Sequence, residues 1–167
     1  LIIKPHMWTY YLDSFGGINL KGQRNLIFKL LDQFDHIKLL EPAEYNVTPY
    51  YKISDLLLTD ASSTIYEMIA LSKPVVVNRF YHLKLSHRIF QKRLYKRRLD
   101  KEMNDEVEKF CFLADNVKQL PLTIEKALNQ KNKNTALIEE YQKKMLYKLD
   151  GSASIRARDE ILKRINR

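Results

Sequence analysis

The chain has few of the residues that mark loop-dominated folds, disordered segments and disulfide frameworks. Its 167 residues include only four glycines and five prolines, which argues against a collagen-like, disordered or loop-dominated chain. The single cysteine, Cys111, cannot form an internal disulfide, and its apolar neighbours Phe110 and Phe112 predict a reduced core residue. These absences favour a folded protein in a reducing compartment, so we expect a cytoplasmic location.

Several catalytic and ligand-binding motifs are also missing. Gly16-Gly17 and Gly22 match neither G-x-G-x-x-G nor the P-loop, which argues against a dinucleotide oxidoreductase or a P-loop kinase. No serine lies in a G-x-S-x-G elbow, and no His, Cys and Asp residues have metal-ligand spacing. No apolar stretch approaches the roughly 20 residues of a membrane-spanning helix. The sequence therefore predicts neither a bound metal nor a cofactor.

The composition is that of one ordinary folded domain with a basic surface. Hydrophobic residues make up 45% and charged residues 29% of the chain, enough for a real core. The net charge of +9, from 29 basic and 20 acidic residues, favours an anionic partner without choosing among nucleotides, nucleic acids and acidic lipids. The chain begins with Leu1 inside an apolar run, so we expect a piece of a longer polypeptide.

Short β-like runs alternate with helical stretches, which predicts parallel βαβ units. The β-like runs cover residues 1–3, 37–40, 55–58, 74–77 and 110–113, and the helical stretches cover 20–34, 49–53, 62–71, 84–101 and 117–128. Two charged amphipathic helices, broken at Asp150-Gly151, are expected within 134–167. We therefore expect an α/β fold with a Rossmann-like parallel sheet, forming a single lobe over 1–167 with C-terminal helices.

The most informative segment is the hydroxyl-rich stretch that follows the run at 55–58. Parallel sheets bind ligands outside the carboxyl ends of their strands, and here Asp60 is followed by Ser62, Ser63 and Thr64 at the start of a helix. Hydroxyl and backbone donors in that place suit a phosphate or pyrophosphate. Helix capping remains an alternative, because Ser62 or Ser63 is a good cap and Thr64-x-x-Glu67 matches a capping box. Asp60 would orient the loop or a sugar hydroxyl.

Two further strand or helix ends carry polar residues. Lys4 and His6 directly follow the first apolar run, where Lys4 can balance an anion and His6 can donate to a phosphate or exchange a proton. A surface histidine on a loop is the plain alternative. At 149–156, Asp150-Gly151 predicts a turn and Ser152 can cap the last helix.

Three segments in order resemble one protein family. The central one runs from Ile53 to Ser63 and continues with Glu67 and the segment 71–76 (Leu-Ser-Lys-Pro-Val-Val). Together with the segments at 2–6 and 149–156, it resembles the CDP-glycerol glycerophosphotransferases, the teichoic acid and capsule polymerase and primase group. The three matches span almost the whole chain, and the central one is the most specific.

The resemblance implies the C-terminal, donor-binding lobe of a GT-B-type transferase. Such an enzyme binds CDP-glycerol, and a hydroxyl of a lipid-linked or growing polymer attacks the phosphate next to glycerol and releases CMP. Ser62, Ser63, Thr64 and Lys4 would bind the donor phosphates, and His6 would act as an acid or charge stabiliser. Asp60 and Glu67 would shape the loop or contact the ribose or sugar.

The sequence also departs from the family pattern. The family's other histidine, in a His-Gly-Thr-Pro segment, is expected upstream of residue 1, so this chain alone is not expected to turn over. Ala61 replaces the usual tyrosine, Met7 rather than proline follows His6, and the segment 78–81 stands where an Arg-Gly pair is expected. These departures leave CDP-ribitol or another alditol phosphate open as the donor.

The helix expected at 84–101 is amphipathic and strongly basic. A helix of this kind is typical of a membrane-surface element, and that role suits a lipid-linked acceptor. It implies a peripheral protein on the inner face of a bacterial membrane. The residues expected at the anionic surface are Arg88, Lys92, Arg93, Lys96 and Arg97. An ordinary core-facing helix with a solvated basic side is the alternative.

Two other functions stay open at this stage. The net charge and the basic helix are compatible with a nucleic-acid-binding module, but no recognisable motif accompanies them, so nucleic acid is not favoured. A nucleotide-sugar glycosyltransferase or epimerase lobe of the same shape is the other alternative, with Glu67 on a ribose or sugar. The transferase lobe is the favoured hypothesis.

Overall fold

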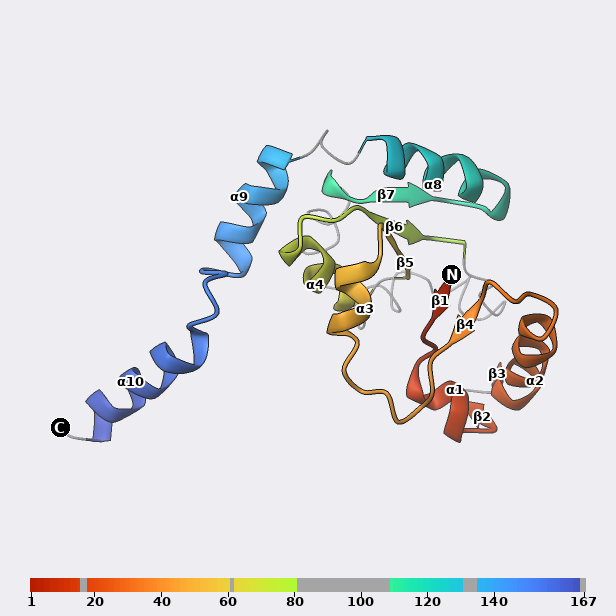
Figure 1. Cartoon of the computed structure of the whole chain (residues 1–167), viewed down its shortest axis with the longest axis horizontal. Coiled ribbons are helices and arrows are strands. Elements are labelled where there is room, and N and C mark those ends of the chain that lie inside the picture. Colours follow the sequence, from red (N-terminus) through yellow and green to blue (C-terminus); the bar gives the residue numbers. More distant parts are fainter. Residues whose placement is uncertain (16–17, 61, 81–108, 131–134, 166–167) are drawn as a thin grey trace, which may run out of the picture. The chain divides into compact units, whose positions relative to one another are not determined.

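The chain is α/β and divides into two compact units, Leu1–Ile53 and Ser54–Arg167 (Figure 1). The computed structural model describes residues 1–15, 18–60, 62–80, 109–130 and 135–165. Small parallel sheets occur in both units, so the expected α/β class is confirmed, whereas the Rossmann-like sheet of a GT-B-type lobe stays a prediction. That both units form one lobe over 1–167 stays a prediction, and the basic helix expected at 84–101 lies outside the described residues.

The first unit is built around two short parallel strands. Strand β1 (Ile2–Ile3) pairs with β4 (Lys38–Leu39), with Ile2 beside Lys38 and Ile3 beside Leu39. Helix α2 (Leu20–Leu31) lies between them in sequence, so the expected strand–helix–strand order is confirmed here. The unit ends with α3 (Thr48–Ile53), which begins one residue before the helical stretch expected at 49–53.

The connection from β1 to α2 holds three elements that the sequence did not predict. Helix α1 (Met7–Tyr11) is followed by an antiparallel hairpin of β2 (Ser14–Phe15) and β3 (Ile18–Asn19). All three are very short, so they carry little hydrophobic periodicity from which to predict them.

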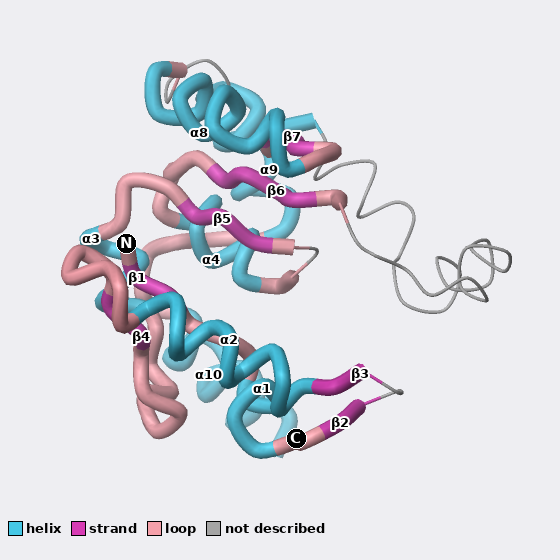
Figure 2. The backbone as a smooth tube through the Cα atoms, turned by 90° about the vertical axis from the view of Figure 1, so that its right-hand side faces the viewer, coloured by secondary structure: helices cyan, strands magenta, loops and turns pink. Residues whose placement is uncertain are grey.

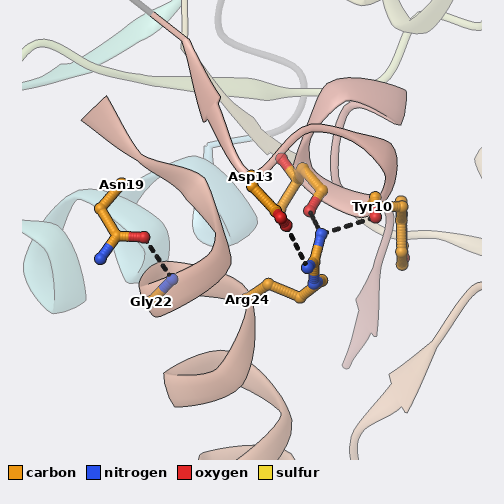
Figure 3. A network of polar contacts seen from close by, with 6 residues as sticks. Tyr10, Asp13, Asn19, Gly22 and Arg24 are labelled. Atoms are coloured by element: carbon orange, nitrogen blue, oxygen red, sulfur yellow. Dashed lines mark hydrogen bonds and ion pairs between the residues drawn. The ribbon is translucent and has the colours of Figure 1, made fainter. Parts of the chain in front are cut away.

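Arg24 of α2 forms hydrogen bonds with the last turn of α1 (Figure 3). The Nη1 of Arg24 donates to the carbonyl oxygens of Thr9 at 3.2 Å and Tyr10 at 2.6 Å, and its Nη2 donates to Asp13 Oδ1 at 3.1 Å. These carbonyls belong to the last turn of α1, where helices leave acceptors without intrahelical partners. Arg24 therefore stabilises a helix that is too short to persist alone.

The second unit contains three parallel strands in the order β5, β6, β7 (Figure 2). Strand β5 (Leu57–Thr59) pairs with β6 (Val75–Asn78), which pairs on its other edge with β7 (Phe112–Ala114). Helix α4 (Thr64–Ala70) connects β5 and β6. The βαβ unit expected from the sequence is confirmed, with the strands starting one or two residues later than expected.

Both faces of the central strand β6 are buried. Val76 packs with Ala114 of β7 and Ala127 of α8 (Leu120–Asn129), and none of the three is exposed. Successive side chains of a strand point to opposite faces, so Val75 and Val77 point away from α8, and both are buried. Helix α4 contacts β5 and β6, and its buried residues are Ile65, Met68 and Ile69. Such two-sided cover is what a parallel sheet requires.

The last two helices of the described chain follow the sequence prediction. Helix α9 (Thr135–Met145) docks on α4, because Gln142 Nε2 donates to the Ile69 carbonyl at 2.6 Å. Helix α10 (Ala153–Ile165) follows a turn in which Gly151 has a φ of +71°, a left-handed conformation that favours glycine. Arg156 pairs with Asp150 across that turn at 2.7 Å. No helix of the described chain is both long enough and apolar enough to span a bilayer.

Candidate functional site

Three strand ends in the second unit meet at one edge of the sheet. The register places Thr59, Val77 and Leu113 side by side on β5, β6 and β7. All three strands are parallel, so the residues that follow them share the carboxyl edge, with neighbouring strands about 4.8 Å apart. Polar residues follow all three strands at this edge: Asp60, Ser62, Ser63, Thr64, Arg79, Asp115 and Asn116. Crevices at this edge are where open α/β sheets bind ligands.

The hydroxyl of Ser62 caps the start of α4. Its Oγ accepts from the backbone N–H of Thr64 at 3.4 Å and from the Thr64 hydroxyl at 3.2 Å, and its carbonyl accepts from Ile65 N. Thr64 is already the first helical residue, so the capping box with Thr64 as the cap was wrong. The N-cap position itself belongs to Ser63, and Ser62, one residue before it, supplies the side-chain acceptor for the first residue of the helix.

Capping does not account for the hydroxyl of Ser63. This residue precedes α4 directly with helical backbone angles, φ −61° and ψ −20°, and its side chain makes no cap hydrogen bond. Its side chain is exposed, as are those of Asp60 and Glu67. Ser63 is exposed and its hydroxyl makes no cap hydrogen bond, whereas the Ser62 hydroxyl accepts from Thr64 and keeps its own O–H as a donor.

An ion pair joins the ends of β6 and β7. The Nε and Nη2 of Arg79 lie 2.8 Å and 2.6 Å from Asp115 Oδ1. The Arg79 backbone N–H donates to the Ala114 carbonyl at 2.8 Å, which extends the ladder one residue beyond β6. The two side chains are 35% and 57% exposed, so the guanidinium is held in place yet reaches solvent. The sequence reasoning missed this pair, although Arg79 directly follows an apolar strand.

Asp115 is itself anchored by the chain that follows it. Its backbone N–H donates to Gln119 Oε1 at 3.0 Å, and Asn116 caps the 3₁₀ turn Val117–Gln119 by accepting from Gln119 N at 3.0 Å. Asp115 is thus fixed by the turn that leads into α8, and it fixes Arg79 in turn.

Lys4 and His6 belong to the first unit. Lys4 Nζ donates to the backbone carbonyl of Glu41 at 2.8 Å, so this cation links the segments that follow β1 and β4. His6 is exposed, and its carbonyl accepts from Thr9 N at 2.9 Å at the start of α1. The structure therefore groups the predicted site residues 60–67 in the second unit, whereas these two lie in a different unit.

The structure also bears on Cys111, on metal binding and on the basic residues expected at a membrane surface. Burial raises the pKa of the Cys111 thiol to about 12, so this thiol stays protonated at neutral pH and is no nucleophile. Among the side chains that the structure describes, no cluster of His, Cys, Asp and Glu could hold a metal ion. The five basic residues expected at a membrane surface, from Arg88 to Arg97, lie outside the described ranges.

The edge therefore combines an exposed hydroxyl, a positioned guanidinium and carboxylates at the ends of three adjacent strands. Hydroxyl and guanidinium donors suit an anionic ligand with several oxygen acceptors, such as a phosphorylated compound. Comparison of the chain with protein-family models, curated proteins and solved structures finds no match.

Proposed function

We propose that this chain is the donor-binding lobe of a transferase. It would move glycerol phosphate, or a related alditol phosphate, from a CDP-activated donor to a hydroxyl of a cell-wall or capsule polymer. The observation that carries the proposal is Ser63, whose exposed hydroxyl has no capping role and follows a strand at the carboxyl edge of a parallel sheet. The resemblance of residues 53–76 to the CDP-glycerol glycerophosphotransferases supplies the donor class.

The proposed reaction is a phosphoryl-group transfer. The acceptor oxygen forms a bond to the phosphorus next to glycerol, and the bond from that phosphorus to the oxygen of CMP breaks. CMP leaves with the electron pair of that bond, and the acceptor hydroxyl loses its proton. Ser63 would donate to a donor phosphate, and Ser62 and Thr64 would keep the loop in shape through their mutual hydrogen bond.

The remaining roles rest on the family resemblance. It assigns His6 as an acid or charge stabiliser, Lys4 as a counter-charge, and Asp60 and Glu67 to the loop or the ribose. The GT-B architecture, the polymer or lipid-linked acceptor and the peripheral position on the inner membrane face are parts of the same proposal.

Nucleotide binding by the full chain tests the proposal. The experiment measures the shift in melting temperature with CMP, UMP and a short single-stranded oligonucleotide. A ligand at 100 times its Kd adds about 2.7 kcal/mol, which corresponds to roughly 5–10 °C for a chain of this size. We expect that shift with CMP and a smaller one with UMP.

The alternative outcomes point to the other functions. A preference for UMP would favour a nucleotide-sugar glycosyltransferase or epimerase lobe. Stabilisation by the oligonucleotide alone, with an affinity that falls steeply with salt, would favour a nucleic-acid-binding module. Either result would overturn the proposed donor class.

A further inference from the structure

We infer that helix α10 lies on an anionic membrane surface, with its apolar face in the lipid headgroup region. The inference rests on the peripheral membrane position within the proposed function. It assigns that position to an element that neither the sequence motifs nor the resemblance connects with a membrane.

The first argument is the exposure of α10. Every residue of this helix except Arg156 is exposed in the described chain, and none is buried. Its large apolar side chains are between 47% and 70% exposed: Ile155, Ile161, Leu162 and Ile165. A helix of 13 residues is marginal in water without tertiary packing. A surface that covers these apolar side chains would therefore stabilise α10.

The second argument is the arrangement of those side chains. Because an α-helix turns by about 100° per residue, the apolar residues from Ile155 to Ile165 fall within an arc of about 120°. The same arc holds Ser154 and, at its middle, Arg158. A single apolar face on an otherwise polar helix is typical of helices that lie in the plane of a bilayer surface.

The third argument is Arg158, which distinguishes a lipid surface from a protein partner. In a protein interface this charge would be buried at the centre of the apolar face, which is costly. At a bilayer its long side chain can reach the headgroups, whose phosphates accept hydrogen bonds. Asp159 Oδ1 accepts from its Nε at 3.0 Å and its Nη2 at 2.8 Å, and the Arg158 side chain is still 65% exposed.

The fourth argument is the charge of the helix. Its basic residues outnumber its acidic ones by four to two, and the whole chain has a net charge of +9. Both acidic residues form ion pairs with arginines of the same helix, Asp159 with Arg158 and Glu160 with Arg164. The remaining positive charge favours an anionic surface over a neutral one.

The test measures binding of the full chain to vesicles by sedimentation. The vesicles contain either phosphatidylcholine alone or an equal mixture with phosphatidylglycerol. The variants are Leu162→Ala, Ile165→Ala, Arg158→Gln and Arg158→Lys. Leu122→Ala and Lys118→Gln are the controls, because they make the same kinds of change at exposed positions outside α10. Alanine favours helix, and circular dichroism verifies the helix content of each variant.

We expect the wild-type chain to bind the phosphatidylglycerol vesicles and to bind phosphatidylcholine alone much more weakly. Leu162→Ala and Ile165→Ala should each weaken binding about tenfold, because much of a large aliphatic side chain no longer enters the interface. Arg158→Gln should weaken it about fivefold, and Arg158→Lys should restore most of the loss, since either cation attracts an anionic leaflet. The two controls should leave binding unchanged.

Three results would overturn the inference. Vesicle binding that Leu162→Ala and Ile165→Ala do not alter would assign the membrane contact to another part of the chain, such as residues 84–101. Equal binding to both kinds of vesicle would show that the surface need not be anionic. Self-association in sedimentation velocity that Leu162→Ala abolishes, without vesicle binding, would assign the apolar face to a second copy.

The melting shift with CMP distinguishes this inference from the proposed donor. A chain that CMP stabilises but that binds no vesicles would overturn the inference and keep the donor class. Vesicle binding that depends on Leu162 and Ile165, in a chain that CMP does not stabilise, would support the inference and overturn the donor class.

Discussion

At the residue scale, two adjacent serines with the same chemistry have different tasks. Ser62 is half-buried and its Oγ accepts two hydrogen bonds from Thr64, whereas Ser63 is exposed and makes no cap hydrogen bond. The first hydroxyl accepts from Thr64 and keeps its own O–H as a donor, whereas the second makes no cap hydrogen bond. Replacing each serine separately therefore distinguishes the contribution to helix stability from the contribution to ligand binding.

We predict that Ser62→Ala lowers the free energy of unfolding by about 1 kcal/mol, the usual loss for a helix cap. Ser63→Ala should change that free energy by less than about 0.5 kcal/mol, as is normal for exposed positions. It should weaken CDP binding about tenfold, because a hydrogen bond to a charged phosphate is lost. Urea unfolding and calorimetry measure the two effects.

Ser154→Ala is the matched control for these variants, because Ser154 is an exposed serine in the first turn of α10. It should change neither stability nor CDP affinity. Equal destabilisation by Ser62→Ala and Ser63→Ala, with equal CDP affinities, would show that both hydroxyls serve only the helix.

At the element scale, β6 is the strand on which the second unit depends. Val75, Val76 and Val77 are each 5% exposed or less, so both faces of this strand are covered. Arg79 directly follows this strand, so packing along β6 helps to position the Arg79–Asp115 ion pair at the candidate site. A defect in this strand should therefore disturb both stability and the site.

We predict that Val76→Ala lowers the free energy of unfolding by about 2 kcal/mol, because it removes buried methyl groups and leaves a cavity beside Ala114 and Ala127. Val117→Ala is the control with the same chemistry at a position that is 64% exposed, and it should cost less than about 0.5 kcal/mol. Urea unfolding measures both. Similar losses at the two positions would contradict the described core.

At the scale of the whole molecule, the two units differ in how much apolar surface they bury. Among the described residues, Leu40 is the one buried apolar side chain of the first unit, whereas the second unit buries residues from β6, β7, α4, α8 and α9. Local stability follows the burial of apolar contacts. The two units should thus open with different free energies.

Hydrogen exchange of the intact chain measures this difference. We predict that the amides of β6 exchange slowest and that those of β1 and β4 exchange at least about tenfold faster, which corresponds to roughly 1.4 kcal/mol in opening free energy. A first unit protected as strongly as β6 would mean that the chain opens as one cooperative body.

Much of the fold could be predicted from hydrophobic patterns. The β-like run at 74–77, the helix at 117–128 and the break at Asp150-Gly151 were each predicted from residues that lie close together in sequence. The structure has β6 at Val75–Asn78, α8 at Leu120–Asn129 and the turn at Gly151. The hairpin of β2 and β3 and the five-residue α1 could not be predicted, because such short elements depend on contacts such as that of Arg24 with the Thr9 and Tyr10 carbonyls.

Local patterns were enough to predict the strand–helix–strand order and the hydroxyl-rich loop after β5, because periodicity and turn chemistry involve neighbouring residues. The folded structure was needed to place the start of α4, and with it the acceptor role of Ser62 and the exposure of Ser63. It also decided that Arg79 meets Asp115, 36 residues away in sequence. The physical reason is register: the pairing of Asn78 with Ala114 brings together the residues that follow each strand, and no local pattern encodes that pairing.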